Sequence, residues 1–495
     1  MVGLIRRVKG TLLEFRRELV VQAVGCCMIV AWAIWMHYSH FEDWSNESRV
    51  PIPGGWQFSV PLGVLVLAAI ASVLLSVTYP ILGCLAFFLV HRATDRYGGD
   101  GVWLLRSGMV YGIAILNCSG WLLWRHHRKV PLGQLLRRPI FWLAIAWIFW
   151  IGAIELVARI ERPEQVPFLL RNWALAMGAV LCLVIALDTV RTVKDLAFIA
   201  FGSVIVIAYR AMVVQEDLWL DGEMALMAVT TMPLLAAVLA LDSWMIALPI
   251  GVLCCAFLAW TLVRTHNRGG YVGLVAAIAA TPLAFPWRLA MPIALGGIAL
   301  AGGILYAYPG YLRRFTEIQT GGRNAGSVQS RLEIYESILS HFPQNRWFGL
   351  GIGRTGYLVE KNLPEVGHMN AHNTWLANLI ESGIPGAMLF NLILLAGLFH
   401  ALRLAWSTGH HRKVVGGAVL CFLAAYCGVG LGHARDLYEV FYLMVGLAAA
   451  FPGGRSQNGV DSGQQHPIVE DKAGVEIAPG GERSDQDQMS RSSIR

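Results

Sequence analysis

The chain has 495 residues, of which 56% are hydrophobic and only 14% are charged, with a formal net charge of +7. A soluble domain carries roughly a quarter charged residues, so this composition excludes an ordinary globular protein and predicts membrane spans of about 20 apolar residues. The positive charge requires no nucleic acid, because basic loops that stay in the cytoplasm orient membrane proteins.

The N-terminus begins with a basic amphipathic arm at residues 1–18, which an apolar run at 19–38 follows. This run is too long for the core of a signal peptide, and no small-x-small cleavage site comes after it. We therefore interpret it as a retained anchor. The basic arm places the N-terminus in the cytoplasm, so the acidic loop 39–57 is expected to be external.

Further apolar runs alternate with polar turns and predict an all-α transmembrane bundle of about 12–14 spans. The predicted spans lie at 58–90 (a hairpin divided at Tyr79-Pro80), 105–124, 140–157, 169–187, 196–209, 225–241, 244–263, 271–285, 289–306, 384–404, 414–431 and 437–451. This count puts the basic clusters at 125–138 and 403–413 on the cytoplasmic side, as the orientation rule requires.

The spans divide the chain into five parts. We expect a cytoplasmic arm (1–18), about 11 spans (19–306), a long external segment (307–373), a catalytic motif with the last spans (374–451) and a tail (452–495). The tail is rich in Gly, Ser, Gln and Asp, which predicts a disordered cytoplasmic segment. All nine cysteines lie in apolar runs, so no disulfide framework or cysteine metal site is expected.

Three candidate functional residues converge on the external face in this topology. His372 closes the external segment, Arg210 ends one outward span, and Arg268 lies between two others. Arginine suits a phosphate ligand, because its planar fork binds in a bidentate manner and keeps its charge when partly desolvated. The alternative is that span-end arginines merely extend to the lipid headgroups. Two glycines after Arg268 would let the backbone approach closely, which favours a functional role there.

The external segment carries two local patterns. Residues 327–342 show helical spacing of Leu332, Tyr335, Leu339 and Phe342, and Ser330 with Glu333 has the spacing of a capping box. Such a helix would lie on the membrane or roof a cavity.

The second pattern is a literal G-x-G-x-x-G from Gly351 to Gly356. No βαβ unit surrounds it, so we reject a dinucleotide site. A tight turn that folds the segment back is the favoured interpretation, and an anion site made of backbone amides is the alternative.

His372 and Asn373 come just before a short amphipathic run and a Gly-Ile-Pro-Gly break that starts at Gly383. A histidine here can cap the next helix or act as a base. A metal site with His368 is disfavoured, because Gly367 and neighbouring Asn370 argue against the helix that such a spacing needs. We predict no metal and no cofactor.

These motifs together resemble the bacterial O-antigen ligase and O-antigen polymerase superfamily. The resemblance covers about residues 260–450 and is carried by Ser330-Arg331-Leu332-Glu333-Ile334-Tyr335, Phe348-Gly349-Leu350-Gly351-Ile352-Gly353, and His372-Asn373 with nine residues before Gly383-Ile384-Pro385-Gly386. Arg268-Gly269 looks like part of that family's S-R-G signature, although Asn267 stands where serine is usual.

The resemblance implies a multi-pass glycosyltransferase of the bacterial inner membrane that works on the periplasmic face without a nucleotide sugar or an obligatory metal. Its donor would be a polyprenyl-diphosphate-linked glycan, and its acceptor a hydroxyl of lipid A-core, a growing glycan or a protein. His372 would be the general base, since imidazole titrates near neutral pH. Arg210 and Arg268 would bind the diphosphate, with Arg264, Arg331 and Asn373 in second rank. Attack opposite the diphosphate would invert the anomeric centre.

Other functions remain open at this point. A transporter or flippase of lipid-linked glycans would also need many spans and cavity arginines, but we find no convincing internal repeat, and the candidate residues gather on one face rather than at the midplane. Ligation to lipid A-core, polymerisation of an exopolysaccharide and O-glycosylation of a protein share these signatures. The residues alone do not separate them.

Overall fold

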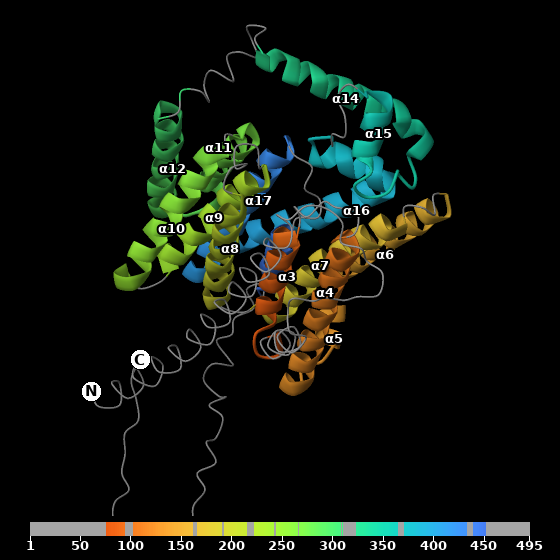
Figure 1. Ribbon diagram of the computed structural model, residues 1–495. Coiled ribbons are helices and arrows are strands. Elements are labelled where there is room, and N and C mark those ends of the chain that lie inside the picture. The colour runs from red at the N-terminus through yellow and green to blue at the C-terminus, as the bar shows by residue number, and fades with distance from the viewer. Residues whose placement is uncertain are drawn as a thin grey trace, which may run out of the picture. The chain divides into compact units, whose positions relative to one another are not determined.

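The computed structural model describes residues 76–94, 102–161, 166–190, 193–214, 222–241, 244–265, 267–307, 309, 323–364, 371–432 and 439–451. Within these ranges the chain forms α-helices joined by turns, with no β-strand (Figure 1). The predicted arm, first anchor and external loop (1–57), the first part of the hairpin and the tail (452–495) lie outside the described residues.

The helices follow one another as α3 (Pro80–Thr94), α4 (Val102–Arg128), α5 (Gly133–Leu136), α6 (Pro139–Glu161), α7 (Val166–Thr189), α8 (Val193–Val214), α9 (Gly222–Leu241), α10 (Trp244–Arg264), α11 (Arg268–Ala284), α12 (Trp287–Ala307), α14 (Arg323–Asn345), α15 (Thr355–Asn362), α16 (Thr374–Ala405), α17 (His410–Gly430) and α18 (Glu439–Ala450).

Five helices in the described ranges are long and apolar enough to cross a membrane, and shorter apolar helices accompany them. The five segments are Pro139–Val157, Glu223–Leu241, Trp287–Tyr306, Thr374–Ala405 and His410–Gly430. A bilayer core requires about 20 apolar residues per helix, so these segments have the expected length. The predicted all-α polytopic membrane fold is confirmed.

Two helix ends differ from the predicted spans. α8 continues one turn beyond Arg210 to Val214, so Arg210 lies inside the helix and not at its end. α4 continues through Arg125, which the sequence placed in a basic cytoplasmic loop. Arg125 instead forms a buried ion pair with Asp188 of α7, and the Trp121 indole N–H donates to the same carboxylate at 2.9 Å. Sequence patterns near a span end did not reveal this pairing, because its partner lies on another helix.

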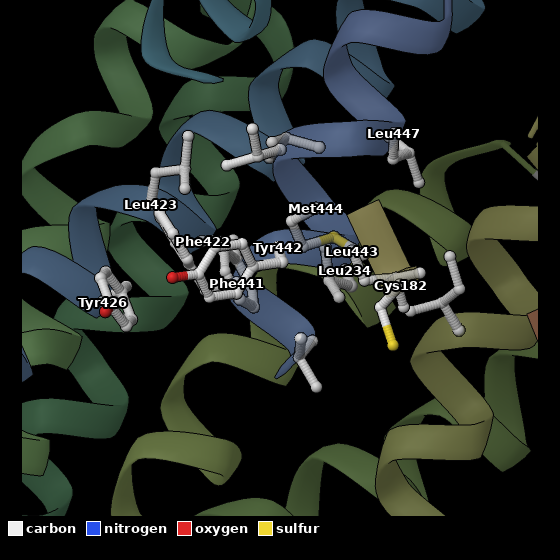
Figure 2. Close-up of a cluster of buried hydrophobic side chains, with 14 of the residues drawn as sticks. Cys182, Leu234, Phe422, Leu423, Tyr426, Phe441, Tyr442, Leu443, Met444 and Leu447 are labelled. Carbon is white, nitrogen blue, oxygen red and sulfur yellow. The ribbon is translucent and has the colours of Figure 1, made fainter. Parts of the chain in front are cut away.

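The helix α18 lies at the centre of the bundle. Every residue from Val440 to Ala450 is buried, and the helix packs against α7, α16 and α17. A helix that is apolar all round belongs inside a protein rather than at its surface. Figure 2 shows Phe441 and Tyr442 of α18 among side chains of α17, where the rings of Tyr426 and Phe441 stack with centroids 4.5 Å apart.

The helix α17 runs antiparallel to both α11 and α16. A Cβ added to Gly417, near the start of α17, would lie 2.5 Å from the Ala284 carbonyl oxygen at the end of α11. One added to Gly416 would lie 2.3 Å from the amide nitrogen of Ala405, at the end of α16. Small residues permit this close helix packing within a membrane. The starts of α11 and α16 therefore both lie toward the end of α17 (Figure 1).

Residues 307–373, predicted to be external, contain α14 and α15, which pack on the first part of α16 around a small apolar core. Ile334, Ile338 and Val359 are buried there with Ala377 and Ile380 of α16. The helix at 327–342 was predicted, but α14 already begins at Arg323. Ser330 therefore lies inside α14 and does not cap it, so the predicted capping box is wrong. Serine is tolerated inside helices, and a Ser-x-x-Glu spacing can therefore occur away from a helix start.

The face of α14 that packs on the protein also differs from the prediction. Leu332 and Leu339 are 54% and 50% exposed, whereas Ile334 and Ile338 are buried, with Tyr335 packed beside them. Two members of the predicted stripe, Tyr335 and Phe342, thus pack on this core, whereas Leu332 and Leu339 do not.

Candidate active site

The start of α11 places Arg268 on a capped helix terminus. Asn267 is the N-cap, and its side-chain oxygen accepts a hydrogen bond from the amide of Gly270 at 3.2 Å. Arg268 is the first residue of the helix and is partly buried. Serine and asparagine are both strong N-cap residues, so Asn267 can supply the same local structure as the serine of the resembling motif. The close backbone approach expected after Arg268 is present, since a Cβ on Gly270 would lie 2.7 Å from the Cβ of Ala225 in α9.

The start of α16 places His372 directly before another N-cap. The Asn373 side-chain oxygen accepts hydrogen bonds from the amides of Trp375 and Leu376, both at 3.0 Å. Asn373, predicted as a second-rank site residue, therefore has a structural task as the cap. His372 is partly exposed and adopts a left-handed backbone with φ of +48°. A non-glycine residue rarely adopts this conformation, and strain of this kind clusters at functional sites.

These two helix starts meet at the end of α17. A Cβ added to Gly430 would lie 3.1 Å from the Thr374 hydroxyl, and one added to Gly432 would lie 3.8 Å from the Cα of Gly269. The helices α11 and α16 also contact each other directly. The structure therefore brings the backbones that carry Arg268 and His372 to one end of the bundle. Helix N-termini carry a positive potential, which favours a nearby anion.

Arg210 belongs to the same end of the bundle. It lies near the end of α8, which packs against the next helix in the chain, α9. Consecutive helices joined by a short connection run antiparallel, so Arg210 and the first residues of α9 lie at one end. Ala225, near the start of α9, packs on Gly270 of α11. The topology thus connects the starts of α9, α11 and α16 with the end of α8.

The remaining candidates lie at different positions. Arg264 ends α10, is exposed, and has its guanidinium 5.7 Å from the centre of the Trp260 ring. Arg331 is partly buried on α14. His368 lies outside the described residues. In the part of the chain that the structure describes, no three His, Cys, Asp or Glu side chains are grouped to hold a metal ion.

The predicted break in α16 is present at Gly383, which has a φ of +68° and a ψ of −179°. The glycine turn before α15 inserts at this break. Leu350 donates its amide to the Ile380 carbonyl at 2.9 Å, and Gly351 donates to the Glu381 carbonyl at 3.0 Å. On the other side of the break, the Ile384 amide donates to the Arg346 carbonyl at 2.8 Å. The G-x-G-x-x-G segment is therefore a tight turn, as predicted, and it supplies hydrogen bonds that the broken helix lacks.

Glycine is required where the turn and the break meet. A Cβ on Gly349 would lie 2.2 Å from the Glu381 carbonyl oxygen, and one on Gly383 would lie 2.2 Å from the Trp347 carbonyl oxygen. Gly349 also has a φ of +70°. A side chain at either position would force the two backbones apart.

The amides of this turn do bind an anion, but the anion is a carboxylate of the chain itself. Glu381 accepts hydrogen bonds from the amide of Gly353 at 2.8 Å, the amide of Thr355 at 3.2 Å and the hydroxyl of Thr355 at 2.5 Å. Glu155 of α6 accepts from the amide of Ile352 at 2.9 Å. The turn thus binds an anion through its backbone amides, and the side chains of Glu381 and Glu155 occupy that site.

Sequence reasoning missed this buried charged group, which we call the glycine-turn cluster: Glu155, Arg354, Thr355 and Glu381. Arg354 is 4% exposed, and Glu155 and Glu381 are each 5% exposed. The charge of Arg354 acts on the Glu155 carboxylate. Buried charges are costly unless paired, so they mark a built feature. A signal was present, because Glu381 is the single acidic residue within the apolar stretch of α16.

A known protein family matches the part of the chain that contains Arg268 and His372. Residues 253–391 match the family described as O-antigen ligase. This part of the chain is therefore similar to an O-antigen ligase domain. The matched part of this domain runs from α10 into the second half of α16 and includes Arg268, His372 and Glu381. No curated protein matches the chain.

The O-antigen ligase match and the apolar helices together support, in general terms, an O-antigen ligase-like membrane glycosyltransferase. Arg210 precedes the matched residues, as does Glu155. The geometry nevertheless connects both to the domain, Arg210 through α9 and Glu155 through its hydrogen bond to the glycine turn.

Proposed function

We propose that this protein transfers a polyprenyl-diphosphate-linked oligosaccharide or polysaccharide onto an acceptor hydroxyl on the periplasmic face of the bacterial inner membrane. The observation that carries the proposal is the meeting of two helix starts at the end of α17. One start holds Arg268 and the other holds His372, and both belong to the O-antigen ligase domain. A cation and a titratable base at one end of a membrane bundle suit a lipid-bound anionic donor.

The donor brings its own leaving group, so the protein has two tasks. It must stabilise the departing diphosphate and activate the acceptor. Arg268 and Arg210 are the proposed diphosphate ligands, because guanidinium groups and helix N-termini stabilise phosphate charge that develops during the reaction. Their position at the end of membrane helices matches a donor whose lipid tail stays in the bilayer.

His372 is the proposed general base. The acceptor oxygen attacks C1 of the first donor sugar while its proton passes to an imidazole nitrogen of His372. The new C1–O glycosidic bond forms as the bond between C1 and the diphosphate oxygen breaks, and both electrons of that bond leave with polyprenyl diphosphate. Attack from the face opposite the diphosphate inverts the anomeric centre. No metal ion takes part in this proposed scheme.

Three acceptors satisfy the same chemistry: a sugar of lipid A-core, a second lipid-linked glycan and a protein hydroxyl. Each offers an oxygen nucleophile to the same donor. The O-antigen ligase match favours a glycan acceptor, and we rank lipid A-core first. Product analysis separates the three, because each leaves the transferred glycan on a different molecule.

The test uses full-length protein reconstituted in liposomes with a labelled polyprenyl-diphosphate glycan, EDTA and each acceptor in turn. Wild type is compared with His372→Ala. Transfer that persists in EDTA and disappears in a correctly folded His372→Ala variant supports the proposal. If wild type transfers nothing yet moves the donor between leaflets, the protein is a transporter of lipid-linked glycans and the proposal is wrong.

A further inference from the structure

We infer that Glu381 is a positioning residue, whose carboxylate locks the glycine turn into the break of α16 and thereby fixes the short helix that presents His372. The catalytic part of this inference rests on the proposed function. Its structural part rests only on the contacts of Glu381. The other carboxylate that faces the turn is Glu155, and the buried cation beside them is Arg354.

The break at Gly383 leaves a short helix at the start of α16. Residues 374–382 form a helix of nine residues between the Asn373 cap and Gly383. Its length is about 13 Å at 1.5 Å per residue. Helices shorter than about 12 residues are marginal alone, because nucleation costs more than a few hydrogen bonds return. Ala377 and Ile380 pack this piece against α14 and α15, and Asn373 caps its first end, which leaves the end at Gly383 to be held.

The glycine turn holds the end of this short helix that lies next to Gly383. Backbone bonds from Leu350 and Gly351 join the glycine turn to the last carbonyls of the piece. The Glu381 side chain then reaches past them to the amides of Gly353 and Thr355 and to the Thr355 hydroxyl. One carboxylate thus binds three donors on the segment that leads into α15. Hydrogen bonds to a charged, buried acceptor are stronger than those between neutral groups. The Glu381 carboxylate is therefore the strongest link between the short helix and the glycine turn.

The contacts of residue 381 require a carboxylate. The amides of Gly353 and Thr355 and the Thr355 hydroxyl all donate to the Glu381 side chain, and an ionised carboxylate is an acceptor only. Glutamine has nearly the same shape but replaces one oxygen by an NH₂ group. That group would face the amide of Gly353 or the N–H and O–H of Thr355, so at least one buried donor would lose its partner. Loss of the lock would let residues 374–382 tilt, and His372 would move with them.

The experiment compares wild type with Glu381→Gln and Glu336→Gln in full-length protein in liposomes. Glu336 is an exposed carboxylate on α14 and serves as the matched control. Hydrogen exchange of residues 374–382 is expected to rise at least about tenfold in Glu381→Gln and to match wild type in Glu336→Gln. Turnover kcat is expected to fall about 10–100-fold with donor KM within about twofold, since small misplacements of a catalytic group have effects of that size.

Thr355→Val supplies a second variant that keeps the buried charge. It removes one donor to Glu381 and is expected to lower kcat several-fold with the same unchanged KM. In the double variant, Thr355→Val should add nothing to Glu381→Gln, because both act through one contact. If Glu381→Gln does not fold, Thr355→Val alone decides the question by the same two measurements.

The outcomes separate the lock from the proposed function. Unchanged exchange in both Glu381→Gln and Thr355→Val, or fully additive losses of kcat in the double variant, would overturn the inference. If wild type transfers no glycan, the proposed function fails. The exchange of residues 374–382 then still shows whether Glu381 holds this helix.

Discussion

Gly430, in the last turn of α17, lies directly against the hydroxyl of Thr374, the first residue of α16. A Cβ at Gly430 would approach the Thr374 oxygen to 3.1 Å and the Trp375 ring to 3.2 Å. Two residues further along, Gly432 faces Gly269 of α11 with ordinary van der Waals spacing of 3.8 Å. The end of α17 therefore sets the spacing between the helix start that carries His372 and the one that carries Arg268.

This relationship predicts different outcomes at the two glycines. Gly430→Val should push the start of α16 away and lower kcat at least about tenfold, because catalysis is sensitive to shifts of about 1 Å. Gly432→Ala should leave kcat within about twofold, since its nearest neighbours leave room for a methyl group. Glycan transfer and thermal unfolding of both variants provide the check. Equal activity in the two variants would contradict the role given to Gly430.

Replacement of His372 should remove most of the turnover. His372→Gln keeps a polar side chain but has no titratable nitrogen, and we expect a loss of about 10²–10⁴-fold in kcat, the usual contribution of a general base. His341→Ala is the control, because His341 lies on α14 and its ring bonds locally to Ser337. Similar losses in both histidine variants would point to a shared structural effect instead of base catalysis.

Arg268 should show the difference between a guanidinium and a point charge. Arg268→Gln is expected to lower kcat/KM for the lipid donor about 100-fold, as the loss of a donor to a developing oxyanion does elsewhere. Arg268→Lys should recover part of that loss, because lysine keeps the charge without the bidentate fork. Exposed Arg288 at the start of α12 gives a matched Arg288→Gln control. The role would be wrong if Arg268→Gln and the control behave alike.

Asn267 should be replaceable by another capping residue. Asn267→Ser is expected to keep wild-type stability and transfer, since serine also accepts a hydrogen bond from the helix amides. Asn267→Ala should destabilise α11 by about 1 kcal/mol and lower activity, because Arg268 is the next residue. Thermal unfolding in detergent and the transfer assay measure the two effects. A stable and fully active Asn267→Ala variant would show that the cap does not position Arg268.

The ion pair between Arg125 and Asp188 should be required for stability and not for chemistry. Removing one partner of a buried pair costs about 3–5 kcal/mol, because the other charge is left buried alone. Asp188→Leu should therefore unfold much more readily, and Arg125→Leu with Asp188→Leu should regain part of the loss. Unfolding of the membrane-embedded variants in a denaturing detergent gives the comparison. Greater damage in the double variant than in Asp188→Leu would refute this account.

Much of the fold was predictable because its signals are local. Apolar runs of sufficient length predicted the spans, and in the described part of the chain each predicted span from 105 onward falls on an α-helix. Helix α3 begins at Pro80, where the chain was expected to break, and the break at Gly383 was also predicted. Proline and glycine restrict or release the backbone wherever they occur, so these positions required no knowledge of tertiary contacts.

The contacts that join distant segments were not predictable in this way. Glu155 and Ile352 are almost 200 positions apart in the sequence, and only the packed bundle brings them together. The buried face of α14 depended likewise on which neighbours covered Ile334 rather than Leu332. Arg268 and His372 were expected on one face from span counting, and the packing on α17 gives that expectation a geometric basis. Their chemical roles stay predictions.

The central position of α18 has a consequence for how the protein is made. Membrane proteins are synthesised from the N-terminus, and earlier segments begin to fold before later ones leave the ribosome. The helices α7, α16 and α17 all precede α18, yet each packs against it. Their inner faces have to wait for the last helix to arrive. A nonsense mutation before Glu439 would shorten the chain only at its C-terminal end. It would nevertheless remove α18, the helix against which α7, α16 and α17 pack.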